Sequence, residues 1–365
     1  MSATAEVQYA TETVDGRDNL VEVVHLTKHF PVKQGVFAAG KAIVHAVEDV
    51  TLTVRKGETL GIVGESGCGK STTARLMVRL LDPTSGVVRF DGRDITKLQQ
   101  RSLRPLRRQM QMIFQDPYSS LNPRKSVGQI IAEPFSIHRT EKDVKRRVQD
   151  LLARVGLSPE HYNRYPHEFS GGQRQRIGVA RAIALQPKLI VCDEPVSALD
   201  VSVQAQILNL LKDLQKDFDL TYVFISHDLS VIRQVSDRIA VMNLGRLVEL
   251  SESEQLYEHP RHPYTAALLS AVPRHSPNGV AAKRQRIVLG GDVPSPVNPP
   301  HACVFHPRCP RFQRGHCDVE TPLLRPFELG HEAACHYPVE RWPMTEEELR
   351  RPSGASAGDP DQTND

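Results

Sequence analysis

The sequence lacks any long apolar run, since no stretch of its 365 residues approaches eighteen consecutive apolar side chains. We therefore expect no helix that crosses a lipid bilayer. An excess of charge of either sign is also missing, because 46 Lys and Arg oppose 43 Asp and Glu and leave a formal charge of +3. So close a balance gives no indication of nucleic-acid binding. Residues 1–19 have neither a basic start nor an apolar centre, so we expect no secretory signal there.

The composition that is present suits a folded α/β protein. Hydrophobic residues make up 39% of the chain and charged residues 24%, enough for a sizeable core. Continuous apolar runs typical of buried parallel strands occur at 59–63, 189–192, 221–226 and 239–242. Apolar residues three or four positions apart, as on amphipathic helices, occur at 70–81, 141–156 and 172–185. The alternation predicts an α/β fold with a largely parallel sheet.

A glycine-rich loop stands between the strand at 59–63 and the helix that begins at Lys70. It reads GESGCGKS and matches the pattern G-x-x-x-x-G-K-[ST]. In such a loop backbone N–H groups and a helix amino terminus surround phosphates, the lysine adds positive charge, and the final hydroxyl binds Mg²⁺. The sequence therefore predicts an ATP and Mg²⁺ site formed by Gly64, Ser66, Gly67, Cys68, Gly69, Lys70, Ser71 and Thr72.

Two adjacent acids, Asp193 and Glu194, end the apolar run at 189–192. Ligands of parallel α/β sheets bind at the carboxyl ends of the strands, which places both acids beside the glycine-rich loop. We predict that Asp193 binds Mg²⁺ together with Ser71. Glu194 is then positioned to deprotonate the attacking water as a general base.

A second glycine-containing turn, Ser170-Gly171-Gly172-Gln173, opens the helix at 172–185. Ser170 is a plausible N-cap, and the glycines leave N–H groups bare at a positive helix end. The segment is therefore a candidate second anion site as well as a helix cap.

These motifs, in this order, resemble the nucleotide-binding domain of ATP-binding cassette (ABC) proteins over about residues 21–255. The resemblance implies a mostly parallel sheet, an antiparallel β subdomain and a helical subdomain at about 116–175. It also adds positions to the site: Phe30 as the adenine-stacking aromatic, Gln115 as the Q-loop glutamine and magnesium ligand, Asp200 in the D-loop, and His227 as the switch histidine.

The same resemblance implies how the ATPase works. Two such domains face each other head to tail, so that Ser170 and Gly172 of one contact the γ-phosphate bound by the other. His227 contacts the γ-phosphate and the attacking water. Gln115 passes the nucleotide state to a membrane partner.

Residues 262–265 and 290–310, which read HPYT and GGDVPSPVNPPHACVFHPRCP, narrow the resemblance to oligopeptide and dipeptide importer ATPases of the second subunit type. That family implies a heterodimer with another ABC ATPase, two permeases, an extracytoplasmic binding protein, and a peripheral place on the cytoplasmic face of the membrane. The cargo is a peptide, with a nickel complex, glutathione or a sugar as alternatives. A non-transport ATP switch is the alternative from another class.

Four of the six cysteines fall close together, at 303, 309, 317 and 335. Disulfides are typical of secreted domains, and structural zinc usually uses tighter Cys pairs than these. A [4Fe–4S] cluster tolerates looser spacing and often has a Cys-Pro, as at Cys309-Pro310. The importer resemblance favours the cluster and five nearby histidines keep zinc open. We expect a disordered segment at 1–19, the nucleotide-binding domain at 20–273, a Cys-rich module at 274–345 that begins with a linker, and a disordered tail at 346–365.

Overall fold

The computed structural model describes residues 18–33, 41–116, 120–272 and 286–344. The predicted terminal tail at 346–365, nearly all of the predicted amino-terminal segment and the first part of the predicted linker lie outside these residues. Within the described ranges, no helix is both long enough and apolar enough to span a membrane. The predicted domain boundaries stay predictions.

The larger sheet has eight strands in the order β11-β12-β10-β9-β3-β8-β7-β6. The five strands from β9 to β6 run parallel, as the apolar runs predicted. The other three are antiparallel to their neighbours. The strands are β3 (Thr59–Val63), β6 (Met110–Ile113), β7 (Leu189–Asp193), β8 (Thr221–Ile225), β9 (Arg238–Asn243), β10 (Arg246–Glu252), β11 (Arg325–Glu328) and β12 (His331–Ala333).

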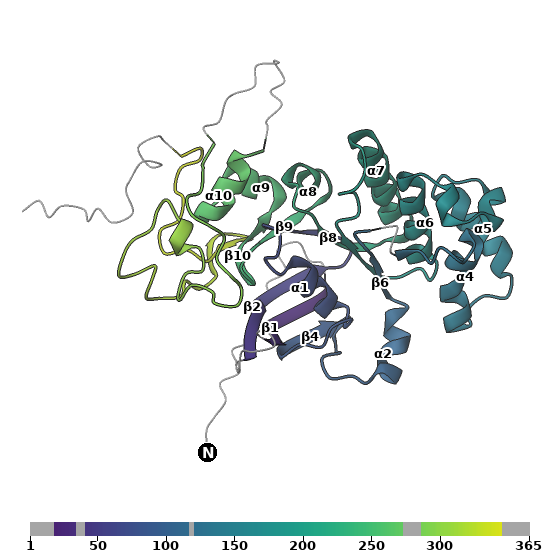
Figure 1. The fold of residues 1–365 in the computed structure, drawn as a ribbon, viewed down its shortest axis with the longest axis horizontal. Coiled ribbons are helices and arrows are strands. Elements are labelled where there is room, and N and C mark those ends of the chain that lie inside the picture. Colours follow the sequence, from purple (N-terminus) through teal and green to yellow (C-terminus); the bar gives the residue numbers. More distant parts are fainter. Residues whose placement is uncertain (1–17, 34–40, 117–119, 273–285, 345–365) are drawn as a thin grey trace, which may run out of the picture.

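A smaller antiparallel sheet lies beside it, with the order β2-β1-β4-β5. Its strands are β1 (Asn19–Lys33), β2 (Lys41–Arg55), β4 (Ser85–Phe90) and β5 (Arg93–Asp94). Helix α1 (Lys70–Met77) lies between the two sheets (Figure 1), and its Ala74, Leu76 and Met77 belong to the apolar core that the sheets share. This position fixes where the helix begins, directly after the glycine-rich loop.

Most remaining helices cover the other face of the large sheet or extend beyond β6 (Figure 1). They are α2 (Gln100–Arg107), α4 (Val127–His138), α5 (Val144–Arg154), α6 (Gly171–Ile183), α7 (Val201–Phe218), α8 (Leu229–Val235), α9 (Ser253–Glu258) and α10 (Pro263–Ser270), with short 3-10 turns η1 (Pro159–Asn163), η2 (Pro166–Glu168) and η3 (His306–Arg308). Helices α4, α5 and the start of α6 form the helical end of the molecule, where the resemblance placed a helical subdomain.

Two details differ from the sequence-based expectation. The helix predicted at 70–81 ends at Met77, because Arg79 turns into the left-handed region with φ 54° and its side chain is buried. The carboxy-terminal residues extend the large sheet, since Glu249 and Leu250 of β10 pair with Ala333 and Glu332 of β12. The described part of the predicted Cys-rich module therefore shares a sheet with the nucleotide-binding part.

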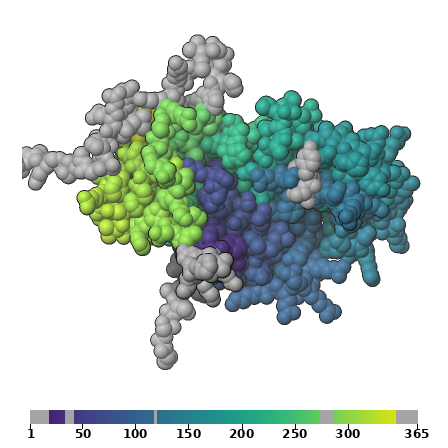
Figure 2. All heavy atoms as spheres, in the orientation of Figure 1, coloured from purple at the N-terminus to yellow at the C-terminus, as the bar shows by residue number. Residues whose placement is uncertain are grey.

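The carboxy-terminal residues also contribute to the main apolar core, which includes the buried Cys303, Phe305 and Cys317. Figure 2 shows these yellow-green residues at one end of the molecule, directly beside the purple amino-terminal strands. The carboxy-terminal residues therefore lie close to the part of the chain that contains the first strands.

Candidate nucleotide site

The predicted catalytic residues converge at one edge of the large sheet. Strands β3, β6, β7 and β8 are parallel, so their carboxyl ends lie side by side. The glycine-rich loop follows β3, Gln115 follows β6, Asp193 and Glu194 end β7, and His227 follows β8.

The phosphate loop, residues 64–71, has two glycines whose lack of a side chain the structure explains. Gly64 has φ 152°, and a Cβ there would lie 2.2 Å from the carbonyl oxygen of Met242. Gly69 has φ 100°, and its Cβ would lie 2.2 Å from the carbonyl oxygen of Ala46. Any other residue would push the loop away from the neighbouring strands.

The lysine of this loop is held by backbone carbonyls. Lys70 is buried, and its Nζ donates to the carbonyl oxygens of Gly64 at 2.8 Å and Glu65 at 2.9 Å. The ammonium group is thus placed inside the loop, while Ser66 and Gly67 at the tip are exposed. Phosphate oxygens entering the loop would meet both its N–H groups and this charge.

Ser71 and Asp193 lie within hydrogen-bond distance across the site. The hydroxyl of Ser71 donates to Asp193 Oδ1 at 2.6 Å, and Asp193 is 1% exposed. Arg75, one helical turn after Ser71, lies 3.4 Å from the other oxygen of Asp193. Two oxygen ligands, a hydroxyl and a buried carboxylate, are therefore side by side, as a Mg²⁺ site requires. Thr72 is the next residue of α1.

Glu194 has a strained backbone conformation, and its carboxylate lies between the side chains of two other predicted site residues. Its φ is 47°, in the left-handed region that non-glycine residues rarely adopt, and its N–H donates to the Ile225 carbonyl oxygen at 3.0 Å. Gln115 Nε2 donates to one carboxylate oxygen at 2.8 Å, and His227 Nδ1 lies 3.2 Å from the other. The sequence did not predict that these three side chains form one hydrogen-bonded group.

The signature segment caps helix α6, as predicted. The Ser170 hydroxyl accepts from the Gln173 N–H, and the Gln173 side chain accepts from the Ser170 N–H. Ser170 is exposed, so the bare helix end is open to a partner molecule. Gly172 has a second reason to be glycine: a Cβ there would lie 2.4 Å from Val203 Cγ1 of α7.

Two further predicted positions lie apart from the phosphate loop along the chain. Asp200 is the exposed N-cap of α7, and it is joined to Glu194 by a turn in which the Ser197 hydroxyl donates to the Glu194 carbonyl oxygen at 3.1 Å. Phe30 lies on β1 opposite Val44, partly exposed, with the Lys28 ammonium 4.9 Å from its ring centre. Its ring is therefore accessible on one of the strands that border α1.

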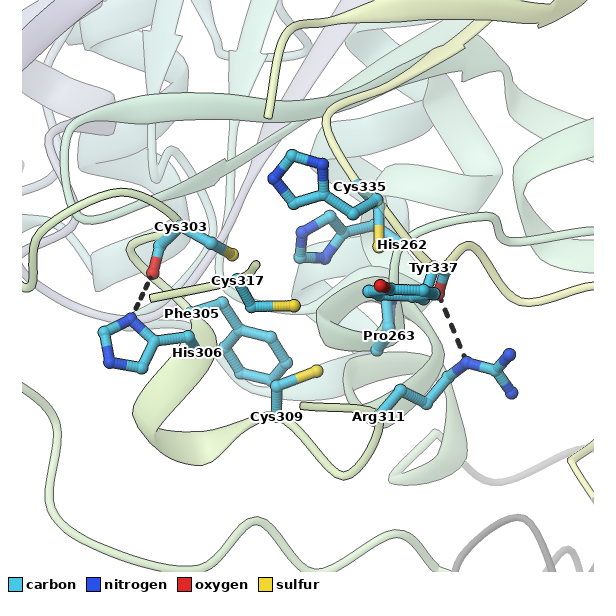
Figure 3. Close-up of a pocket in the computed structure, with 11 residues that line it drawn as sticks. His262, Pro263, Cys303, Phe305, His306, Cys309, Arg311, Cys317, Cys335 and Tyr337 are labelled. Atoms are coloured by element: carbon cyan, nitrogen blue, oxygen red, sulfur yellow. Dashed lines mark hydrogen bonds between the residues drawn. The ribbon is translucent and has the colours of Figure 1, made fainter. Parts of the chain in front are cut away.

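The four carboxy-terminal cysteines line one small cavity, together with His262, Phe305 and Tyr337. In Figure 3 the sulfur atoms of Cys303, Cys309, Cys317 and Cys335 point toward a common space. None of the four forms a disulfide. Burial raises the pKa of each thiol, to about 12 for Cys335.

The cysteine sulfurs are widely spaced for a single ion. Among the described His, Cys, Asp and Glu residues, the triads of ligand atoms within 4.8 Å of one another are His29–His45–Glu48 and His316–Glu320–His336, and no cysteine triad is among them. One zinc ion with Zn–S bonds of 2.3 Å would hold its sulfurs only about 3.8 Å apart. Three of these sulfurs would therefore have to move closer together to bind one zinc ion.

Two residues that the sequence gave no sign of reach the phosphate loop from the carboxy-terminal part. The Tyr264 hydroxyl accepts a hydrogen bond from the Glu65 N–H at 2.8 Å. Arg308 forms two hydrogen bonds with the Glu65 carboxylate, at 2.7 and 2.8 Å. These contacts join positions 199 and 243 residues apart, so no local pattern marks them.

Comparison with known proteins agrees with this geometry. Residues 47–197 match the family model "ABC transporter", and residues 248–317 match "Oligopeptide/dipeptide transporter, C-terminal region". A dimeric post-hydrolysis structure of an ATP-binding cassette bound to ADP and Pi superposes with a TM-score of 0.57 at 29% identity, covering 64% of this chain and 98% of that one. Cassette cbiO1 from Clostridium perfringens gives a TM-score of 0.56 at 26% identity, covering 66% and 91%.

The fold and the converging motifs together define an ATPase of the ATP-binding cassette class. Closely similar sequences define the family within it. The oligopeptide transport ATP-binding protein AppF of Bacillus subtilis is 53% identical, covering 89% of this chain and 99% of its own length. The dipeptide transport ATP-binding protein DppF of Escherichia coli is 48% identical, covering 89% and 96%. The chain belongs to the family of oligopeptide and dipeptide transport ATP-binding proteins.

Proposed function

We propose that this chain is the ATP-hydrolysing subunit of an importer for dipeptides or oligopeptides. The observation that carries the proposal is the match to peptide transport ATP-binding proteins over nearly the whole chain, including residues 248–317 beyond the central cassette motifs. The alternatives of another cargo or a non-transport switch have no relative among these proteins in their favour.

In the proposed reaction the phosphate loop binds ATP, and Ser71 with Asp193 holds Mg²⁺, with Gln115 as a further ligand. The 2.6 Å contact between Ser71 Oγ and Asp193 Oδ1 supports this role. Bound Mg²⁺ neutralises charge on the phosphate oxygens. Lys70 exchanges its carbonyl partners for the β- and γ-phosphates, which places its charge where negative charge develops.

Glu194 is the proposed general base. Its carboxylate is held on one side by Gln115 and on the other by His227, at 2.8 and 3.2 Å. Contacts from two sides keep the carboxylate in place at the end of β7, next to the expected position of the γ-phosphate. When Gln115 or His227 turns from Glu194 to the nucleotide, one carboxylate oxygen of Glu194 becomes free to accept a proton from the attacking water.

The exposed signature segment supports a head-to-tail pair of cassettes. Ser170 is exposed and Gly171 and Gln173 are partly exposed at this positive helix end, whereas Gly172 is buried against α7. The turn that ends at Asp200 lies beside them, with Leu199 next to Gly171. We assign the opposite position to a second, different ABC ATPase subunit. ATP between phosphate loop and signature joins the two subunits, and hydrolysis separates them.

The membrane partners are two permease subunits, served by an extracytoplasmic binding protein, and the chain is peripheral on the cytoplasmic face. A groove along α4 supports a docking place for a permease helix. It is lined by Arg124, Lys125, Gln129, Ala132, Glu133, Ser136 and Ile137. Among these residues, Ile137 is 48% exposed. Lys125 and Glu133, which also line the groove, form an ion pair at 2.9 Å.

For the cysteine cavity we propose a [4Fe–4S] cluster with Cys303, Cys309, Cys317 and Cys335 as ligands. No three of the four free thiols lie within 4.8 Å of one another, which supports a centre larger than a single zinc ion. When bound, such a centre supplies four metal–thiolate bonds that fix the surrounding short turns.

Replacement of Glu194 by Gln tests the ATPase assignment. The amide keeps the shape of the side chain but cannot take a proton, so we expect hydrolysis to fall at least about a hundredfold while ATP binding is retained. Turnover by the purified protein and affinity for a fluorescent ATP analogue are the measurements. Glu254→Gln, an exposed acid on α9, is the matched control. Equal turnover in Glu194→Gln and the wild type would contradict the role of Glu194.

A further inference from the structure

The residue after Gly64 is held on three sides, although phosphate-loop chemistry does not require a side chain there. The Glu65 N–H donates to Tyr264, the Glu65 carbonyl oxygen accepts from Lys70, and the Glu65 carboxylate pairs with Arg308. Lys70 comes from the loop itself, whereas Tyr264 and Arg308 come from the carboxy-terminal part. The conformation of the loop is therefore partly determined from outside the cassette motifs.

Both outside residues are largely buried. Tyr264 is fully buried on α10, with its ring 5.3 Å from that of Phe305 and 6.5 Å from that of His262. The Arg308 side chain is 9% exposed and forms two charge-assisted hydrogen bonds to one carboxylate. A bidentate, mostly buried pair of this kind fixes geometry, unlike a solvated surface ion pair.

The same two residues are next to residues that line the cysteine cavity, although neither lines it itself. Arg308 ends η3, the turn that joins Cys303 to Cys309. Within it the Cys303 carbonyl oxygen accepts from the His306 N–H at 3.1 Å, the Phe305 carbonyl oxygen accepts from the Arg308 N–H at 3.0 Å, and the His306 carbonyl oxygen accepts from the Cys309 N–H at 3.3 Å. Phe305 lines the cavity and contacts Tyr264.

We propose that Tyr264 and Arg308 are positioning residues for ATP binding, and that through them the filling of the cysteine site controls nucleotide affinity. The second half rests on the proposed metal centre. Ligation of Cys303 and Cys309 fixes the turn between them, which fixes the Arg308 guanidinium against Glu65. Without such ligation, the turn is held by its own hydrogen bonds and by packing, and the position of Arg308 is less tightly fixed.

Such a coupling acts in both directions, because two ligands that favour the same conformation raise each other's affinity by the same factor. The link is the backbone of the phosphate loop, because Tyr264 and Arg308 both hold Glu65, and the N–H groups of that loop are predicted to bind phosphate. The hydrolytic group of Glu194, Gln115 and His227 lies on other strands and does not touch Arg308. The effect should therefore appear in binding of ATP and leave the chemical step unchanged.

The experiment measures the Kd for ATP by calorimetry on the full chain, purified without oxygen, for the wild type and Arg308→Gln. We expect a rise of about five- to tenfold in Kd, within the usual range of coupled sites. KM for ATP should rise with it, with kcat nearly constant. Arg308→Lys keeps the charge but not the paired geometry and should recover only part of the affinity. Arg314→Gln, an exposed arginine of the same region, is the control and should bind as the wild type does.

Iron content is measured in every sample, so that loss of the metal centre is separated from loss of the Glu65 contact. Removal of iron by a chelator should weaken ATP binding by the wild type and leave Arg308→Gln unchanged. Equal Kd values for Arg308→Gln and Arg314→Gln would overturn the positioning role. Equal wild-type affinity before and after verified iron removal would overturn the coupling. A protein that purifies with no metal refutes the cluster and with it the coupling, while the Arg308→Gln result still decides the positioning role.

Discussion

At the scale of single residues, the site is built from groups that serve packing and chemistry together. Glu194 is held with φ 47°, and its two carboxylate oxygens contact Gln115 and His227. Strain of this kind persists only where the surroundings fix it. Here the Ile225 carbonyl oxygen of the neighbouring strand accepts from the Glu194 N–H. The strained residue is also the one to which we assign the proton transfer.

Gly172 separates the packing role of the signature from its proposed role in binding phosphate. Its missing side chain leaves room for Val203, whose Cγ1 would lie 2.4 Å from a Cβ. We expect Gly172→Ala to lower the free energy of unfolding by about 1 to 3 kcal/mol, as overpacking does. Urea denaturation measures this change.

The second variant, Gly172→Ala with Val203→Ala, restores the space. We expect it to regain most of the lost stability. If its ATPase activity also returns, Gly172 acts through packing alone. If activity stays low in the stable double variant, the glycine is needed at the phosphate of the partner subunit. Unchanged stability in the single variant would contradict the crowding described here.

At the scale of elements, the parallel strands were the most predictable part of the fold. Strands β3, β7, β8 and β9 are buried throughout, so a continuous apolar run marks each of them in the sequence. The loop and the acids that follow two of these strands could then be placed at one edge by topology alone. Strands β11 and β12 carry no comparable pattern, because they are short and partly exposed.

Contacts between distant elements escaped prediction for a physical reason. Arg308 and Glu65 are both common surface residues by type, and long-range contacts such as the pairing of β12 with β10 bring the carboxy-terminal part to the phosphate loop. Gly172 looked like a phosphate contact, although Val203 alone already explains its size. Local patterns predicted candidate binding residues, whereas the contacts that hold these residues in place depend on the tertiary fold.

The groove along α4 yields a prediction about coupling to the permease. Ile137 is apolar and half exposed, as expected for a side chain that a partner covers. Ile137→Asp should leave ATP hydrolysis by the isolated chain near the wild-type rate, because α4 lies outside the nucleotide site. It should reduce peptide-stimulated hydrolysis by the assembled complex at least about tenfold, since a buried unpaired charge opposes docking. Val319→Asp, exposed in the carboxy-terminal part, is the control, and an equal loss in it would argue against a docking groove.

The cysteine cavity yields a prediction about metal content. Protein purified without oxygen should contain about four irons per chain and absorb near the blue end of the visible spectrum, as [4Fe–4S] clusters do. Cys309→Ala should lose this absorbance, because the cluster then lacks a ligand. One zinc per chain and no iron would refute the assignment.

At the scale of the whole molecule, the carboxy-terminal part and the nucleotide site form one connected structure. The large sheet runs from β6, next to the strand that carries Asp193, to β11 in the carboxy-terminal part. The main core contains residues of helices α4 to α8 as well as Cys303, Phe305 and Cys317. The opposite end of the molecule carries the α4 groove and the signature. We thus assign regulation of ATP binding to the carboxy-terminal part and contacts with partner subunits to the end that carries the α4 groove and the signature.

Uptake of peptide by living cells shows whether this chain powers peptide import. Cells in which this chain carries Glu194→Gln are compared with cells that carry the wild type, with a labelled tripeptide as the transported compound. If the chain powers a peptide importer, uptake falls to the level of cells that lack the chain, and the wild-type chain restores it. Uptake in the Glu194→Gln cells equal to that of the wild type would contradict the account.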